Sequence, residues 1–345
     1  MTADTGFSGA DKITSNGALT LTGVESGATV QYSIDGGTTW TGSFTPVEGA
    51  NSVQVRQTDI AGNPGLASAA FAFTLDTIAP VTPGVALTTD TGIVGDKLTS
   101  NGALTLTGVE VAVGTKVEYS VDGGATWGTT FTAVEGLNIV QVRQTDVAGN
   151  VSIPSGGFVF TLDTTNPVAP GVALTSDTGS SNSDKITSNG ALTLTGVEGG
   201  AAVEYSIDGG ATWNPTFTAA EGANSVQVRQ TDVAGNVSTA SAAFTFTLDT
   251  VAPAVPTVAL TSDTGSSPID KITSNGALTL TGVEGGASVQ YSVDGGTTWS
   301  NTFTPVQGAN SVEVRQTDVA GNVGPAARPS RSLWTRSLRS LREWL

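Results

Sequence analysis

One fifteen-residue segment occurs four times along the chain with little change. It reads Asp-Lys-Ile-Thr-Ser-Asn-Gly-Ala-Leu-Thr-Leu-Thr-Gly-Val-Glu, with Leu for Ile in one copy, and begins at Asp11, Asp96, Asp184 and Asp270. A tryptophan follows each copy, at Trp40, Trp127, Trp213 and Trp299, with spacings of 87, 86 and 86 residues. A period this constant indicates one structural unit per copy, so the 345 residues predict four small domains, each with one modest core.

The period also sets the predicted domain boundaries. The repeats are expected at 1–87, 88–174 and 175–260, with an incomplete fourth repeat at 261–326 and a different segment at 327–345.

Short segments of the third repeat alternate apolar and polar residues, which predicts strands with one buried and one solvent-facing side. These segments are Ala191–Gly196, Ala202–Ile207, Ser225–Thr231 and Ala243–Leu248. The side chains expected to face the core are Val203, Tyr205, Ile207, Val226, Val228, Phe244, Phe246 and Leu248. With Val258–Leu260 and short strands around the Trp and Phe, the repeat has about seven strands, which predicts an all-β, immunoglobulin-like β-sandwich.

Two prolines stand in each link between repeats. They are Pro80 and Pro83, Pro167 and Pro170, and Pro253 and Pro256. Paired prolines favour an extended, semi-rigid connection. An odd number of strands places the two ends of each sandwich at opposite poles, so we expect neighbouring repeats to contact each other end to end in an array of roughly 150 Å.

The chain is acidic and lacks two reactive residue types. Its formal net charge is −16, every repeat carries more acidic than basic residues, and there is no Cys and no His. The charge argues against nucleic acid and anionic membranes as partners and favours cations. Without Cys or His, disulfides, thiolate or imidazole metal sites and Ser–His or Cys–His catalysis are excluded. No apolar run is long enough to span a bilayer, so direct membrane insertion is not expected.

Residues 327–345 do not continue the repeat. They are rich in Arg and lack the closing segment found at Phe244–Thr250. Codons for Ser330–Arg336 can be chosen so that, shifted by one base, they spell the same residues as Phe244–Thr250. We therefore interpret 327–345 as a non-native tail from a single-base deletion between about Asn322 and Ala327, and expect the fourth sandwich to lack its last strand. The alternative is an amphipathic basic helix.

Each repeat contains the pattern Ser-x-Asp-x-Gly-x-Thr-Trp. It stands at Ser33–Trp40, Ser120–Trp127, Ser206–Trp213 and Ser292–Trp299. The pattern resembles the Asp-box of sialidases and related propellers, where it closes a hairpin and is not the catalytic site. A sialidase would also need an arginine cluster, whereas each repeat has one Arg on a strand. We therefore expect a structural role for this motif, and no enzyme activity.

Aspartates are predicted at both ends of each sandwich. Three of them share the C-terminal end of one repeat and face a fourth at the N-terminal end of the next. Several carboxylates and backbone carbonyls around one junction suit Ca²⁺, which binds about six to eight oxygens. The candidate calcium ligands are Asp4, Asp11, Asp76 and Asp146, then Asp90, Asp96, Asp163 and Asp232, and then Asp177, Asp184, Asp249 and Asp318. The alternative is that these aspartates cap loops as Asx-turns.

Three motifs together carry a resemblance that extends from Thr2 to about Val323. They are Leu-Asp-Thr-x-Ala-Pro, Tyr-Ser-x-Asp-Gly-Gly-x-Thr-Trp and Val-Arg-Gln-Thr-Asp-x-Ala-Gly-Asn. The combination resembles the bacterial Ig-like repeats of giant RTX, type I-secreted adhesins and biofilm-associated surface proteins. The resemblance implies a Gram-negative origin, an extracellular or cell-surface location, calcium-stiffened junctions and a spacer role. Any host or matrix ligand would be bound by parts outside this segment.

The leading interpretation is a structural stalk of a cell-surface adhesin. Near-identity between the copies favours it, because a binding site needs only one copy. A glycan- or protein-binding Ig-like module and an accessory region of a secreted hydrolase remain alternatives.

Overall fold

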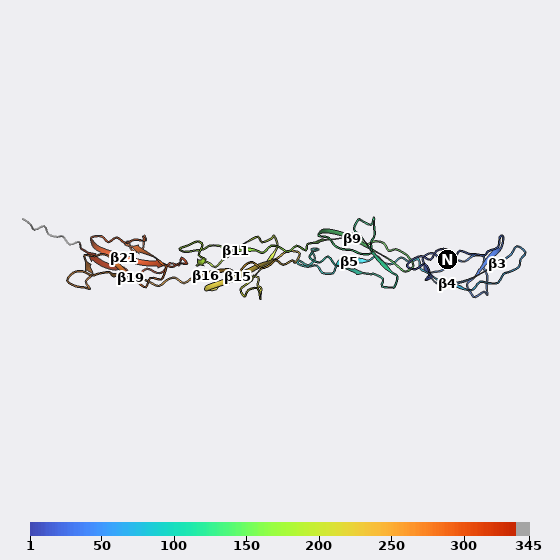
Figure 1. The fold of residues 1–345 in the computed structure, drawn as a ribbon, viewed down its shortest axis with the longest axis horizontal. Coiled ribbons are helices and arrows are strands. Elements are labelled where there is room, and N and C mark those ends of the chain that lie inside the picture. Colours follow the sequence, from blue (N-terminus) through green and yellow to red (C-terminus); the bar gives the residue numbers. More distant parts are fainter. Residues whose placement is uncertain (336–345) are drawn as a thin grey trace, which may run out of the picture. The chain divides into compact units, whose positions relative to one another are not determined.

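A computed structural model describes residues 1–335, which form twenty-two strands and no helix. Sheets recur along the chain (Figure 1), and the chain is a tandem series of immunoglobulin-like β-sandwiches, as the sequence predicts. Since this part of the chain has no helix, it has none that could cross a membrane. Two compact units can be distinguished. They comprise Met1–Thr165 with Val233–Asn236, and Asn166–Asp232 with the described residues from Val237 onward.

The second repeat illustrates the topology. Its strands are β5 (Gly84–Leu87), β6 (Leu98–Thr99), β7 (Leu104–Thr107), β8 (Lys116–Ser120), β9 (Gly136–Thr145) and β10 (Phe158–Leu162). One sheet has the order β6-β10-β9-β8, and the other pairs β5 with β7. The β6–β10 pair is parallel, whereas the other pairs are antiparallel. The segment that contains β5 lies before residue 88, yet β5 pairs inside the second sandwich.

The order of the four-stranded sheet recurs in the other repeats, and the two-stranded sheet recurs in repeats 3 and 4. Repeat 1 contains β1 (Ile13–Thr14), β2 (Thr29–Ser33), β3 (Gly49–Thr58) and β4 (Phe71–Leu75). Repeat 3 contains β11 (Gly171–Leu174), β12 (Ile186–Thr187), β13 (Leu192–Thr195), β14 (Ala202–Ser206), β15 (Gly222–Thr231) and β16 (Phe244–Leu248). Repeat 4 contains β17 (Thr257–Leu260), β18 (Ile272–Thr273), β19 (Leu278–Thr281), β20 (Ser288–Ser292), β21 (Gly308–Thr317) and β22 (Ser330–Trp334).

The core of each sandwich lies between its two sheets. In repeat 2, Val140, Val142 and Phe160 of the large sheet are almost fully buried, and the side chains of Val85 and Leu104 from the small sheet pack against them. Period-two alternation places these residues on one face of their strands, which is why the sequence pattern predicts them.

Two details differ from the sequence-based prediction. The complete repeats have six strands, and the short strand expected around the Trp is a single bridge, such as Tyr119 to Gly128. The prediction that Ile207 faces the core is wrong, because its side chain is 70% exposed. β14 ends at Ser206, and Ile207 begins the hairpin loop, where the alternation no longer applies.

The prediction that repeat 4 lacks its last strand is also wrong. β22 pairs with β21 and β18 in the register that β16 uses in repeat 3. Backbone hydrogen bonds do not depend on side-chain type, and the spacing from the start of β21 to the start of β22 equals that from β15 to β16, so the strand position is filled. Ser330, Ser332 and Trp334 now occupy the inward positions of Phe244, Phe246 and Leu248. Residues 336–345 of the predicted tail lie outside the described residues.

Candidate functional site

The first compact unit contains a junction between repeats 1 and 2, which is built from two loops. The hydroxyl of Thr5 donates to the carbonyl of Ala148 at 2.6 Å, and Phe7 N–H donates to Val147 O at 3.1 Å. Gly6 has a φ of +94°, and a Cβ there would lie 1.9 Å from Val147 O. Only glycine therefore allows this approach of the two backbones.

An asparagine bridges the same junction. Asn150 Nδ2 donates to Asp76 O at 2.8 Å and to Asp146 Oδ2 at 2.8 Å, and Asn150 N–H donates to Asp146 Oδ1. Asp146 is 5% exposed, and its carboxylate lies inside the junction, where the two hydrogen bonds from Asn150 stabilise the loop that contains both residues.

The second compact unit repeats this junction between repeats 3 and 4. Thr178 donates to Ala320 O at 2.6 Å, Asn322 Nδ2 donates to Asp249 O at 2.7 Å, and a Cβ on Gly179 would lie 1.9 Å from Val319 O. Matching distances in two places indicate that the contact is specified by the sequence of the two loops.

The glycine contact gives a testable expectation. Gly179→Ala should separate the loops and widen the distribution of distances between repeats 3 and 4. Because the chain has no native Cys, spin labels on Cys introduced at the exposed positions Ala202 and Ser288 would report this by pulsed electron resonance. The control is Gly265→Ala, at the equivalent glycine of repeat 4, where a Cβ meets only Ile272 O at 3.5 Å. An unchanged distribution in the Gly179 variant would contradict the proposed role of this contact.

Half of the predicted calcium ligands form Asx-turns. One carboxylate oxygen of each accepts the backbone N–H two residues later. At the first position of the pattern this is seen for Asp11, Asp96, Asp184 and Asp270, and at the end of the last strand for Asp76, Asp163 and Asp249. Asp318 binds Asn322 as Asp146 binds Asn150, and Asp232 stands at the same position of repeat 3.

The aspartate of the Asp-Thr-Gly loop is different. Asp4 Oδ2 accepts the N–H of Lys12 at 3.1 Å, and Lys12 has a left-handed φ of 62°. The other oxygen, Oδ1, is buried without a hydrogen-bond partner, and the same holds in every copy of the loop. The four residues with this unpaired oxygen are Asp4, Asp90, Asp177 and Asp263. Each leaves an acceptor that a cation or water could satisfy.

In repeat 1 the structure brings three predicted ligands to one end of the sandwich but not around one point. Asp4, Asp11 and Asp76 lie at the same end of repeat 1, since Lys12 O accepts the N–H of Thr74. Within residues 1–335, however, no three Asp or Glu side chains are positioned together to hold a metal ion.

The Ser-x-Asp-x-Gly-x-Thr-Trp motif closes a hairpin. Asp122 accepts hydrogen bonds from the hydroxyl and N–H of Thr126 and from the hydroxyl of Ser120. The bonds from Thr126, and then the one from Ser120, lower the pKa of Asp122 to about 2. The equivalent bonds also lower the pKa values of Asp35, Asp208 and Asp294.

These bonds predict a pH dependence. A free aspartate has a pKa of about 3.9, so the stabilisation from Asp122 is fully present above that value and is lost as pH falls through about 2. We expect the free energy of unfolding to decrease between about pH 4 and pH 2. Urea denaturation across this range should show a shallower decrease for Asp122→Asn. Equal slopes for the two proteins would contradict the assignment.

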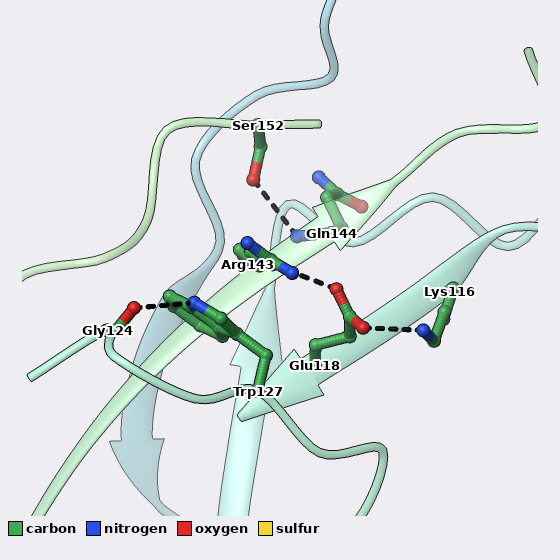
Figure 2. Close-up of polar contacts among 7 residues, drawn as sticks. All are labelled: Lys116, Glu118, Gly124, Trp127, Arg143, Gln144 and Ser152. Atoms are coloured by element: carbon green, nitrogen blue, oxygen red, sulfur yellow. Dashed lines mark hydrogen bonds and ion pairs between the residues drawn. The ribbon is translucent and has the colours of Figure 1, made fainter. Parts of the chain in front are cut away.

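One arginine of each repeat packs on the motif's tryptophan. In Figure 2, Arg143 lies between the ring of Trp127, 4.3 Å from its centroid, and Glu118, whose Oε2 accepts from Arg143 Nε at 2.8 Å. Lys116 Nζ pairs with Glu118 Oε1 at 2.5 Å. Burial opposes ionisation of Glu118, but the bonds from Lys116 and Arg143 outweigh it and lower its pKa. The arginine is thus held in the fold, in line with the predicted structural role of the motif.

A buried glutamine holds the linker and was missed in the sequence. Gln144, 1% exposed, donates Nε2 to Val81 O at 2.7 Å and to Gly108 O at 2.9 Å, and accepts from Glu110 N. Gln230 and Gln316 make the corresponding bonds. The sequence contains a sign of this role. In Val-Arg-Gln-Thr, the glutamine lies two residues after an inward-facing valine and therefore points to the core, where a polar side chain needs hydrogen-bond partners.

Comparisons with known proteins agree with this architecture. Residues 165–250 match the family described as "Bacterial Ig-like domain". Exoglucanase B of Cellulomonas fimi is 35% identical over 213 residues, which cover 54% of this chain and 19% of that protein. The chain therefore spans about a fifth of the length of this curated relative.

The chain is also similar to a solved structure of a tandem-repeat protein. It is the "tetra-tandem repeat in extending region of large adhesion protein", 16% identical, with 90% of this chain and 92% of that chain covered and a TM-score of 0.29. The family match at residues 165–250 includes the strands of repeat 3, and the other copies share the motifs of this segment.

Proposed function

We propose that this chain is a non-catalytic spacer segment of a large bacterial surface adhesin, which carries a distal adhesive region away from the cell. The observation that carries the proposal is the junction itself. The same threonine-to-carbonyl and asparagine-to-carbonyl bonds join neighbouring repeats in both compact units. A segment that transmits position along a chain needs such repeated direct contacts, whereas a ligand-binding domain does not.

The spacer proposal has a direct measurement. Small-angle scattering should give a maximum dimension of roughly 150 Å, the length expected for four sandwiches arranged end to end. Gly6→Ala combined with Gly179→Ala should shorten the mean dimension, because the loops at two junctions would no longer contact each other. A compact particle in the unaltered protein would contradict the proposal.

We also propose that the parent adhesin is of the RTX type, is exported by a type I system and acts in biofilms. This part of the proposal rests on the motif resemblance alone.

We also propose that Ca²⁺ binds at the junctions, but through fewer aspartates than the sequence predicted. The support is the buried, unpaired Oδ1 of the Asp-Thr-Gly loop in each repeat, which in repeats 1 and 3 is next to the threonine that contacts the following repeat. Backbone carbonyls would have to complete the coordination. Millimolar Ca²⁺ should raise the melting temperature relative to a chelator, and Asp177→Asn should reduce the increase. Asp122→Asn, in the hairpin, should not. An unchanged melting temperature in the unaltered protein would remove calcium from the proposal.

An accessory role in a secreted hydrolase is the second candidate. The similarity to exoglucanase B favours it, over a segment that covers 19% of that protein. A full-length reading frame that contains a catalytic domain would support this candidate, whereas anchor and adhesive regions would support the spacer. Binding of the chain to cellulose or another insoluble glycan would favour a binding module instead.

A further inference from the structure

An asparagine followed directly by glycine occurs at the same place in every repeat. The asparagines are Asn16, Asn101, Asn189 and Asn275. Each side chain is exposed, and its Oδ1 accepts the backbone N–H two residues later at 3.0 or 3.1 Å. The turn thus uses the amide oxygen of the asparagine and does not need its amide nitrogen.

In repeat 3 the groups required for a ring closure are free. Among the residues that the structure describes, neither the Gly190 N–H nor the Asn189 Nδ2 has a hydrogen-bond partner. Gly190 also has no side chain that could shield its nitrogen from Asn189 Cγ. The N–H of Ala191 lies 3.1 Å from Asn189 Oδ1, which is the oxygen that takes up negative charge when a nucleophile attacks Cγ.

The packing of the turn requires glycine after the asparagine. A Cβ on Gly190 would lie 2.5 Å from the Cβ of Ala219, and a Cβ on Gly17 would lie 2.5 Å from Cγ of Pro46. A β-branched residue, which would shield the asparagine, therefore cannot stand there unless the neighbouring loop moves. The reactive dipeptide is a consequence of how the turn packs.

This turn is connected to the junction between repeats 3 and 4. Asn189 N–H donates to Thr187 Oγ1 at 3.0 Å, and Asn189 O accepts from the same hydroxyl at 3.3 Å. The N–H of the next residue back, Ser188, donates to Thr178 Oγ1 at 2.7 Å. The Thr178 hydroxyl in turn donates to Ala320 O across the junction. A change in the backbone at position 189 would therefore move the hydroxyl that joins the two repeats.

We propose that Asn189 is a self-modification site, and that its slow deamidation loosens this junction. The Gly190 nitrogen forms a bond to Asn189 Cγ, the Cγ–Nδ2 bond breaks, and ammonia leaves with the proton of the Gly190 N–H. Water then opens the five-membered imide at one of its two carbonyl carbons. Opening at Cγ gives aspartate, whereas opening at the backbone carbonyl gives isoaspartate. The reaction consumes water and releases ammonia, and it needs no oxidant or reductant.

The two products differ in their effect on the turn. Aspartate keeps an oxygen that accepts the N–H of Ala191 and leaves the spacing along the backbone unchanged. Isoaspartate routes the main chain through the former side chain and adds a carbon atom between Ser188 and Gly190. The added atom breaks the paired bonds between residue 189 and Thr187, so the isoaspartate form is the one that releases the junction.

The first test follows the full chain during incubation in mildly alkaline buffer. Peptide mass spectrometry should show conversion of Asn189 to aspartate and isoaspartate about tenfold or more faster than conversion of Asn322, a difference of about 1.4 kcal/mol in barrier height. Asn322 is the internal control because a β-branched residue, Val323, follows it, and its Nδ2 donates to Asp249 O and Asp318 Oδ2. Equal rates at the two asparagines would overturn the site.

The second test measures the distance between repeats 3 and 4 with the spin labels at positions 202 and 288. The distance distribution should widen in proportion to the isoaspartate content. Asn189→Asp has the new charge on a normal backbone and should keep the narrow distribution during the same incubation. A wide distribution in fresh Asn189→Asp would overturn the role of isoaspartate. Isoaspartate without widening would overturn the link to the junction. This second test rests on the junction contact of the proposed spacer, whereas the mass measurement does not.

Discussion

Replacing Ser330 and Ser332 of β22 with phenylalanine should raise the free energy of unfolding of repeat 4 by about 3 kcal/mol or more, on the scale of core Phe-to-Ala changes. In repeat 3 the equivalent Phe246 is 4% exposed and packs edge-on against Phe217 at 6.4 Å between ring centroids. β22 supplies a serine hydroxyl at this place, which fills little of the space and packs few atoms.

Denaturation with urea, monitored by hydrogen exchange of β21, measures the effect in repeat 4 separately from the other repeats. The outward Arg331→Thr is the matched control and should change stability little, because its side chain is exposed. The converse change, Phe246→Ser, should destabilise repeat 3 by a similar amount. If the phenylalanines leave repeat 4 unaltered, β22 does not pack as the last strand of the sandwich.

Gln230→Leu should lower the free energy of unfolding of repeat 3 by about 3 kcal/mol, because it removes three hydrogen bonds that a fully buried side chain makes to the backbone. The side chain is 0% exposed and bonds to Val168 O, Gly196 O and Glu198 N. Leucine fills much of the volume but supplies neither donor nor acceptor. Because Val168 lies between the two linker prolines, the variant should also expose the linker to proteolysis.

Repeat 1 supplies the comparison for this variant. Gln57 is partly exposed and lacks the linker carbonyl, so Gln57→Leu should cost about 1 kcal/mol. Urea denaturation and limited proteolysis of both variants would test the difference. Equal losses in the two repeats would show that the bond to the linker contributes little.

Much of the fold could be predicted because repetition and alternation report backbone periodicity. Val226, Val228 and Phe246 were expected in the core and are buried. Ile207 was misplaced, because alternation cannot show where a strand ends and a hairpin loop begins. Pairing of β22 was missed because composition argued against a strand, whereas the backbone spacing that sets register was unchanged.

The sequence predicted where the candidate site lies, but not which groups make the contacts there. Strand order put the aspartates of Asp-Thr-Gly and Asp-x-Ala-Gly-Asn at the junctions, but the contacts there are made by Thr5, Asn150 and backbone carbonyls. Aspartate side chains satisfy nearby N–H groups first, which a pattern of charges does not reveal. The clash that requires Gly6 depends on a residue more than a hundred positions away, Val147, and sequence alone gives no such distance.

The parallel pairing of β6 with β10 has a mechanical consequence. Tension along the polypeptide would pull the end of β10 past β6 and β9, so their cross-strand hydrogen bonds would be loaded in shear and not opened one after another. Resistance to such tension is governed by the unfolding rate and not by equilibrium stability. A repeat with this strand pair should therefore unfold only at high force. Each repeat that unfolds would lengthen the chain before the next repeat unfolds.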